Sequence, residues 1–255
     1  MTGDAEGVVP LVDAHCHIDL FEQPRKVLAE AETQHVYTIA VTNAPSVFSH
    51  TATLVAQSKY VRAAIGLHPE LVHSHAHELS SFPTFLRQTR YVGEIGLDYT
   101  TPVTTERHEQ RRVFESILRW AAEYGDKILT VHSRRAAKDV VNCVGDKFPG
   151  AVIFHWFSGS SKELEAAVRC GVYFSVNTAM LRTQRGRMLI SQMPSDRVIT
   201  ETDGPFICDE NRPNTPPDTA KILPQLAALW KIDNASARAT VLNTFRKLIR
   251  EGHDA

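Results

Sequence analysis

The stretch VDAHCHIDL, from Val12 to Leu20, carries the strongest signal in the chain, because a short apolar run ends there in two histidines. Successive side chains of a strand point to opposite faces, so His15 and His17 project from the same face. Cys16 lies between them and is expected to pack on the other side. Two imidazoles on one face of a strand form a chelating pair, and the rest of the chain must supply further ligands.

Short apolar runs alternate with amphipathic stretches along the chain, which is the pattern of βα units around a parallel sheet. Apolar residues spaced i, i+4 predict a helix over Thr105–Tyr124. Ser160 and Glu163 form a capping-box signature for a helix that ends at Gly171. The eight candidate strands are 10–17, 37–43, 61–69, 91–98, 127–133, 151–157, 172–177 and 197–203.

Eight strand signals in 255 residues indicate an α/β protein with a (β/α)8 TIM-like barrel, a fold whose size is typically ~250 residues. A doubly wound open sheet is the alternative, but its first strand should lead into a Gly-rich phosphate turn, and HCHIDL is not one. No linker divides the chain, so a single domain over 1–255 is expected. The irregular stretch 203–218 is expected to be a long loop.

Composition and charge narrow the function class. The chain is 43% hydrophobic and 22% charged with a formal net charge of -1, so it lacks a global field that recruits nucleic acid, and any polyanion must be held locally. The acidic N-terminus lacks the features of a signal peptide, and no run approaches the ~18 apolar residues of a membrane span. Four scattered cysteines form no C-x-x-C pair. A cytoplasmic protein without a membrane partner is expected.

Polar residues stand at the C-terminal ends of the predicted strands, which is where barrel active sites lie. Each histidine alone is a weak signal, since a lone histidine at a strand end more often packs. Together they form a nitrogen and oxygen set without thiolate, which suits Zn²⁺, Mn²⁺, Mg²⁺ or Fe²⁺ and suffices for two ions bridged by a carboxylate. The candidate ligands are His15, His17, Glu94, His132, His155 and Asp203.

Four further residues near this rim are candidates for other roles, and for two of them, His68 and Arg134, two interpretations stay open. His68, at the end of the third strand, faces the rim and contacts a substrate phosphate or leaving group, or else packs at a loop start. Arg134 suits a bidentate phosphate contact, or else begins a solvated helix. Glu201 is expected to be a buried ion-pair partner. Alternation turns Trp156 away from the metal ligands, so packing is expected for it.

Six motifs resemble, in order and at the expected intervals, those of TatD-family metal-dependent hydrolases of the amidohydrolase superfamily. They are VDAHCHIDL, AAIGLHPEL, YVGEIGLDY, LTVHSR, VIFHWFSGS and DRVITETDGPF, and they cover nearly the whole chain. The resemblance implies a centre of two divalent ions (Mg²⁺, Mn²⁺ or Zn²⁺) held by the six candidate ligands. It implies that Glu94 bridges the ions and that Asp203 accepts the proton of the attacking water. It also implies a 3′ to 5′ exonuclease acting on single-stranded nucleic acid.

Departures from the family pattern indicate that the substrate loops have drifted, because FESILRWA and NRPNTPP differ from the usual F..QL.LA and RNEP. HCHIDLFEQP and IAVTNAPSVF resemble the TatD-like subunit of Qat antiphage defence systems, which implies partner subunits in a defence complex. Two alternatives stay open. One is a metal-dependent ester or amide hydrolase, such as an aminoacyl-tRNA deacylase. The other is a scaffold subunit whose metal site only stabilises a complex. The six candidate ligands argue against this alternative, because a structural metal site is normally four-coordinate.

Overall fold

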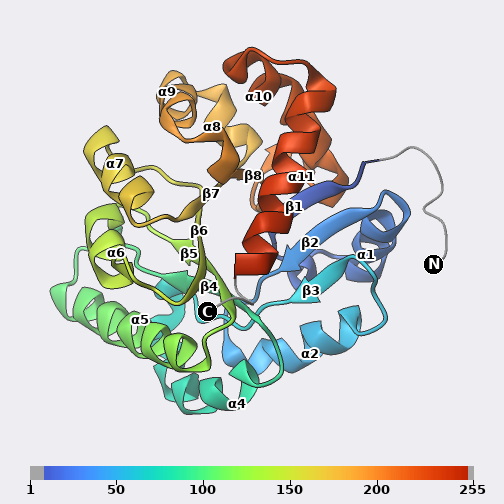
Figure 1. Ribbon diagram of the computed structural model, residues 1–255. Coiled ribbons are helices and arrows are strands. Elements are labelled where there is room, and N and C mark those ends of the chain that lie inside the picture. The colour runs from blue at the N-terminus through green and yellow to red at the C-terminus, as the bar shows by residue number, and fades with distance from the viewer. Residues whose placement is uncertain (1–8, 252–255) are drawn as a thin grey trace.

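The computed structural model describes residues 9–251 and shows a ring of parallel strands surrounded by helices (Figure 1). The ends of the predicted unit 1–255, residues 1–8 and 252–255, lie outside the described residues. The eight strands of the ring are β1 (Leu11–Cys16), β2 (Val36–Ala40), β3 (Val61–Ala63), β4 (Tyr91–Gly96), β5 (Lys127–His132), β6 (Gly150–His155), β7 (Tyr173–Val176) and β8 (Val198–Thr200). Each falls inside one predicted strand or within a residue of it.

Consecutive strands pair in parallel, from β1 to β3 and from β4 to β8. A bridge between Ile65 and Val92 joins the two sheets. The ring closes between β8 and β1, where the N–H of Asp203 donates to the carbonyl of His15 at 2.9 Å. The strands thus form a closed ring, so the predicted barrel is confirmed and the open-sheet alternative is wrong.

Helices form the outer layer of the barrel (Figure 1). The helix expected over Thr105–Tyr124 is α5, and the predicted capping box is present, because the Ser160 hydroxyl accepts from the Glu163 N–H at 3.3 Å. Among residues 9–251, no helix is long and apolar enough to cross a membrane. The helices are α1 (Pro24–Thr33), α2 (Pro45–Val55), α3 (Val72–His75), α4 (Phe82–Leu86), α5 (Thr104–Tyr124), α6 (Ala137–Val144), α7 (Ser161–Arg169), α8 (Thr178–Arg182), α9 (Gln184–Gln192), α10 (Leu223–Trp230) and α11 (Asn234–Glu251).

Helix α11 covers the N-terminal end of the barrel. The hydroxyl of Tyr173, the first residue of β7, donates to the carboxylate of Glu251 at 2.6 Å. Arg90, which precedes β4, donates to the carbonyl of Ile249 at 3.1 Å. The last helix therefore closes the N-terminal end of the barrel, and the candidate ligands lie at the opposite, C-terminal end.

Two glycines allow the backbone beside Glu94 to pack closely. A Cβ at Gly66 would lie 2.0 Å from the carbonyl oxygen of Thr42 and 2.4 Å from the backbone nitrogen of Glu94. A Cβ at Gly93 would lie 2.1 Å from a methyl carbon of Thr130. Backbone atoms cannot give way at such distances, so only glycine fits at position 66, and Glu94 is held at a fixed place in the ring.

The stretch 203–218, expected to be a long loop, contains a short antiparallel hairpin of β9 (Cys208–Asp209) and β10 (Arg212–Pro213). The two turn residues, Glu210 and Asn211, have positive φ angles of 51° and 62°, as a tight hairpin turn requires. The turn carries Glu-Asn, and not the Asn-Gly or Asp-Gly pair that normally signals such a turn. For this reason the sequence does not predict the hairpin.

Candidate metal centre

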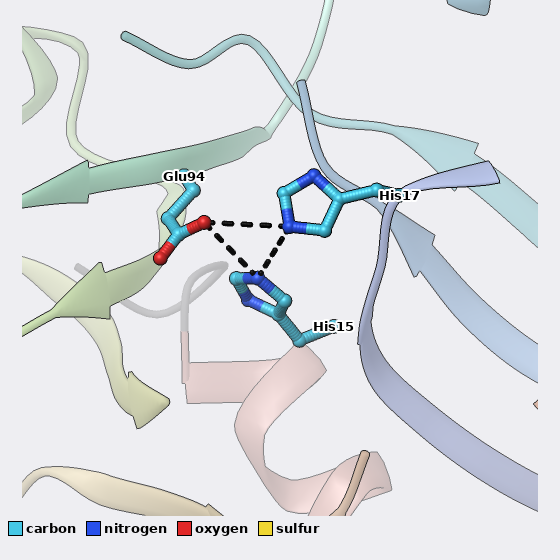
Figure 2. Close-up of side chains that lie close together, drawn as sticks. All are labelled: His15, His17 and Glu94. Atoms are coloured by element: carbon cyan, nitrogen blue, oxygen red, sulfur yellow. Dashed lines mark hydrogen bonds and ion pairs between the residues drawn. The ribbon is translucent and has the colours of Figure 1, made fainter. Parts of the chain in front are cut away.

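His15 and His17 converge at the C-terminal end of β1. Their Nε2 atoms lie 3.2 Å apart, and each lies 3.4 Å from Oε2 of Glu94 (Figure 2). The regular strand ends at Cys16, and the chain turns at His17, whose φ and ψ are -91° and 71°. Cys16 is fully buried, and its thiol donates to the carbonyl of Gly204 at 3.7 Å, so it packs as expected. The two imidazoles are thus placed as a chelating pair.

Glu94 lies at the middle of the site, and its two carboxylate oxygens face different histidines. While Oε2 faces the pair from β1, Oε1 lies 2.7 Å from Nδ1 of His132 and 3.6 Å from Nε2 of His155. His68, predicted as a substrate contact, is as close, with Nε2 3.5 Å from Oε1. One carboxylate therefore connects two groups of imidazoles.

Asp203 completes the site from the side of β8. Its Oδ1 lies 3.7 Å from Nε2 of His15 and 3.6 Å from Nε2 of His17. It lies beyond the regular strand with a positive φ of 50°, a conformation that Asp adopts more readily than most residues. The structure thus brings all six candidate ligands together at one rim.

Three of the imidazoles are held from behind, because a second polar group binds the ring nitrogen that does not face the centre. Such contacts fix the orientation of a metal-binding imidazole and raise its basicity. Glu201 is fully buried and pairs with a histidine, as predicted. The three contacts are His15 Nδ1 to Thr130 Oγ1 at 2.7 Å, His132 Nε2 to Asp98 Oδ2 at 2.8 Å and His155 Nδ1 to Glu201 Oε2 at 3.0 Å.

The spacing of the polar atoms fits metal ions. In the first group, Nε2 of His15 and His17 lie between 3.2 and 3.7 Å from each other and from the facing oxygens of Glu94 and Asp203. Two ligands at ~2.1 Å from one ion are about 3.0 to 3.4 Å apart. Buried charges without such a partner are unfavourable, so this donor set suits a divalent cation.

The electrostatics of the cluster also favour cation binding. Burial lowers the pKa of His17, but the carboxylates of Asp203 and Glu94 outweigh burial and raise it to about 9. Burial likewise opposes the effect of Asp98 and Glu94 on His132, whose pKa rises to about 10. Against the effect of burial, the surrounding imidazoles hold the pKa of Glu94 well below its usual range. The carboxylates of Glu94 and Asp203 therefore favour their anionic form, and a cation held by these residues would displace protons from the imidazoles.

A cavity of about 570 Å³ opens over the centre, lined by His68, Arg134, Trp156 and Phe206 among others. Trp156 is 37% exposed and Phe206 is 60% exposed. The expectation that Trp156 packs away from the site is wrong, because β6 ends at His155 and the positive φ of 39° at Trp156 breaks the alternation of a strand. Sequence reasoning missed Phe206, although it stands only three residues after Asp203.

Comparisons with known proteins agree with this geometry. The family model described as TatD related DNase matches residues 12–250. A putative deoxyribonuclease from Danio rerio is 30% identical over 214 residues, which make up 77% of this chain and 80% of the relative. The 3′-5′ ssDNA/RNA exonuclease TatD of Pectobacterium parmentieri is 28% identical over 235 residues, or 85% of this chain and 89% of that protein.

Solved structures share the whole fold. The crystal structure of YJJV, a TatD homologue from Escherichia coli K12, superposes with a TM-score of 0.84 at 25% identity. The match covers 94% of this chain and 98% of that chain. An uncharacterized amidohydrolase from Saccharomyces cerevisiae, at 16% identity and a TM-score of 0.79, has the same barrel.

Proposed function

Because the chain belongs to the TatD-related DNase family, we propose that it removes nucleotides from the 3′ end of single-stranded DNA or RNA with the help of two divalent ions. Its membership and its relatives make it a metal-dependent hydrolase that acts on phosphodiester bonds. The names of the bacterial relatives, which give 3′-5′ ssDNA/RNA exonuclease, support the polarity and the single-stranded substrate.

The observation that carries the proposal of two ions is the position of Glu94. One of its oxygens lies 3.4 Å from the imidazoles of His15 and His17, and the other lies within 3.6 Å of three further imidazoles. A carboxylate between two groups of ligands suits a bridge between two ions. The oxygen and nitrogen donors suit Mg²⁺, Mn²⁺ or Zn²⁺.

Four side chains of the site have proposed roles in the reaction. Divalent ions supply positive charge that stabilises the negative charge developing at phosphorus and that makes a water molecule more acidic. Asp203 accepts the proton of the attacking water, and Glu94 positions the two ligand groups relative to each other. His68 and Arg134 line the cavity, where they contact the phosphate being cleaved and the leaving oxygen.

The test is an assay on a 5′-labelled single-stranded oligonucleotide, with chelator-treated protein and with Mg²⁺, Mn²⁺ or Zn²⁺ added back. We expect a ladder of successively shorter products with each active metal and none in the chelated protein. Cleavage of a circular single strand, or full activity after chelation, would contradict the proposal. Hydrolysis of an aminoacyl ester without any cleavage of the oligonucleotide would favour the carbonyl-hydrolase alternative.

The wider setting of the enzyme is proposed on the sequence alone. We propose that residues 1–255 form one catalytic unit in the cytoplasm and that partner subunits of a defence complex bind it. The resemblance of HCHIDLFEQP and IAVTNAPSVF to a Qat subunit supports the partners. Purification of the tagged protein from its own host tests them, since an enzyme recovered without any stoichiometric companion would contradict this proposal.

A further inference from the structure

A second cleft adjoins the catalytic cavity on one side. Its volume is about 510 Å³, and we call it the arginine cleft after Arg134, Arg135 and Arg185, which line it together with the loop 158–160. Arg134 and Ser158 also line the catalytic cavity, so the two spaces lie side by side. A ligand bound over the metal ligands can therefore extend into the arginine cleft.

The arginine cleft is strongly positive. Within the described part of the chain, neither Arg134 nor Arg135 forms an ion pair. Arg185 donates one nitrogen to the carbonyls of Ser158 and Gly159 at 3.0 and 3.2 Å, which leaves most of its five N–H groups free to bind an anion. The carboxylate in the lining, Glu163, already accepts from the backbone N–H of Ser160 at 2.6 Å. Such a cleft suits several phosphate groups.

Another space next to the catalytic cavity has the opposite charge. A pocket of about 470 Å³, here called the acidic pocket, is lined by Glu70, Asp98, Glu106 and Glu109, and no lysine or arginine is among its described lining residues. Glu70 and Asp98 are shared with the catalytic cavity.

Protein groups neutralise part of the acidic pocket. Asp98 pairs with His132 at 2.8 Å, and Glu109 pairs with Arg112 at 2.6 Å. Within the described residues, the carboxylate of Glu106 accepts a hydrogen bond from the neutral hydroxyl of Thr101 and forms no ion pair. Among the ion pairs of residues 9–251, none involves the carboxylate of Glu70 or Glu106, so the protein leaves both without a cationic partner and a phosphate placed there would be repelled.

We propose that the arginine cleft holds the phosphates of the nucleotides upstream of the scissile bond, while the terminal nucleoside lies toward the acidic pocket. This inference rests on the proposed function. A 3′-terminal nucleoside carries no phosphate beyond the scissile one, so carboxylates tolerate it. A strand that continued past the centre would bring its next phosphate against Glu70 and Glu106. The charge difference between the two sides therefore selects for chain ends.

The exposed aromatic rings are placed to assist this binding mode. Trp156 and Phe206 line the catalytic cavity, which adjoins both charged spaces. Bases stack on such rings without regard to their identity. Binding through phosphates and stacking predicts little sequence preference.

The first test is Arg135→Gln, because Arg135 lines the arginine cleft but not the catalytic cavity. Two substrates are compared, a 5′-labelled single-stranded oligonucleotide and bis(4-nitrophenyl) phosphate, which carries a phosphodiester without further phosphates. We divide the kcat/KM for the oligonucleotide by the kcat/KM for bis(4-nitrophenyl) phosphate and expect this ratio to fall about 5- to 20-fold in the variant. The slope of log(kcat/KM) for the oligonucleotide against log salt should become shallower by about 0.7. Arg246→Gln, at an exposed position on α11, is the matched control and should leave both values unchanged.

The second test is Glu106→Gln with oligonucleotides that end in a 3′-hydroxyl or a 3′-phosphate. The parent should cleave the 3′-phosphorylated strand more slowly, because the extra phosphate lies at the acidic pocket. The variant should reduce this discrimination by about threefold. Equal rates on both ends in the parent would overturn the proposed direction of the strand.

The two proposals fail in different ways. If the parent hydrolyses both substrates but Arg135→Gln leaves their ratio and the salt slope unchanged, the arginine cleft does not bind the strand. If Arg135→Gln lowers both kcat/KM values equally, Arg135 only supports the fold and the inference is overturned. If the parent hydrolyses neither substrate with any metal, the proposed function is wrong and the inference falls with it.

Discussion

The two ends of the barrel bury polar groups in different ways. At the N-terminal end, the ammonium of Lys127 donates to the carbonyls of Leu86 and Thr89 at 2.8 and 3.1 Å, so the protein itself satisfies it. At the C-terminal end, carboxylate and imidazole atoms face a common point without full protein partners, and the described residues offer none to the buried Nδ1 of His17. Polar groups at the N-terminal end therefore stabilise the fold, whereas those at the C-terminal end are arranged to bind a ligand.

The largest effect expected from this difference is that of Asp203→Asn. The amide keeps the size of the side chain but cannot accept the proton of the attacking water, so kcat should fall about 10³- to 10⁴-fold, even with excess metal. Circular dichroism should show an intact fold. Oligonucleotide cleavage by the variant at the rate of the parent would remove Asp203 from the mechanism.

Glu94→Gln should have the next largest effect. The variant loses one negative charge between two groups of imidazoles, so metal is retained less well and kcat/KM should fall about 10²- to 10³-fold. Unlike Asp203→Asn, this variant should recover part of its activity as Mn²⁺ is raised. Metal analysis and cleavage assays on the same preparation check both points, and a variant with the metal content of the parent would contradict the bridging role.

Removal of metal should lower stability at the C-terminal end. A ligand that binds only the folded state at 100 times its Kd adds ~2.7 kcal/mol to the free energy of unfolding. We therefore expect the thermal midpoint of chelator-treated protein to rise on addition of Mn²⁺ or Zn²⁺, and to rise less for Glu94→Gln. The same midpoint with and without metal would show that the cluster is stable by itself.

Much of this end could be predicted from the sequence, since strand periodicity and the position of polar residues after each strand place His15, Glu94 and Asp203 at one rim. The alternation of a strand gave a wrong prediction for Trp156, which comes directly after the end of β6. A positive φ at this residue breaks the alternation, and the side chain lines the catalytic cavity. The acidic pocket was not predictable either. Glu70 and Glu106 belong to different βα units, and only the path of the connecting loops brings them to one pocket.

At the N-terminal end, Lys127→Met should lower stability without affecting chemistry. The change leaves the buried carbonyl of Leu86 and the partly buried carbonyl of Thr89 without their donor, which is expected to reduce the free energy of unfolding by ~1 to 3 kcal/mol. Urea unfolding measures this loss, and kcat/KM on the oligonucleotide should stay within about twofold of the parent. Lys26→Met, at an exposed position on α1, is the control and should change neither quantity. A loss of activity in Lys127→Met at full stability would break the distinction between the two ends.

The smallest effect is expected for Asp218, which comes after β8 in the chain. Like Lys127 at the N-terminal end, Asp218 has its polar partners within the protein. Arg212 donates to both of its oxygens at 2.8 and 2.7 Å, and Lys221 lies 2.9 Å away. Against the effect of burial, Arg212 and Lys221 lower the pKa of Asp218 to about 2. Since the unfolded value is about 3.9, the pair stabilises the protein above that pH and loses its effect as the pH falls toward 2.

Asp218→Asn should therefore lower the free energy of unfolding by only ~1 kcal/mol at pH 7, because solvent screens the half-exposed Arg212. The difference between parent and variant should shrink as the pH is lowered below about 4, and high salt should reduce it at neutral pH. Activity should change little, because Asp218 is paired within the protein and does not face the metal ligands. If this variant instead lost as much activity as Asp203→Asn, a charge near the rim would matter for catalysis whether or not the protein pairs it, and the comparison of the two ends would fail.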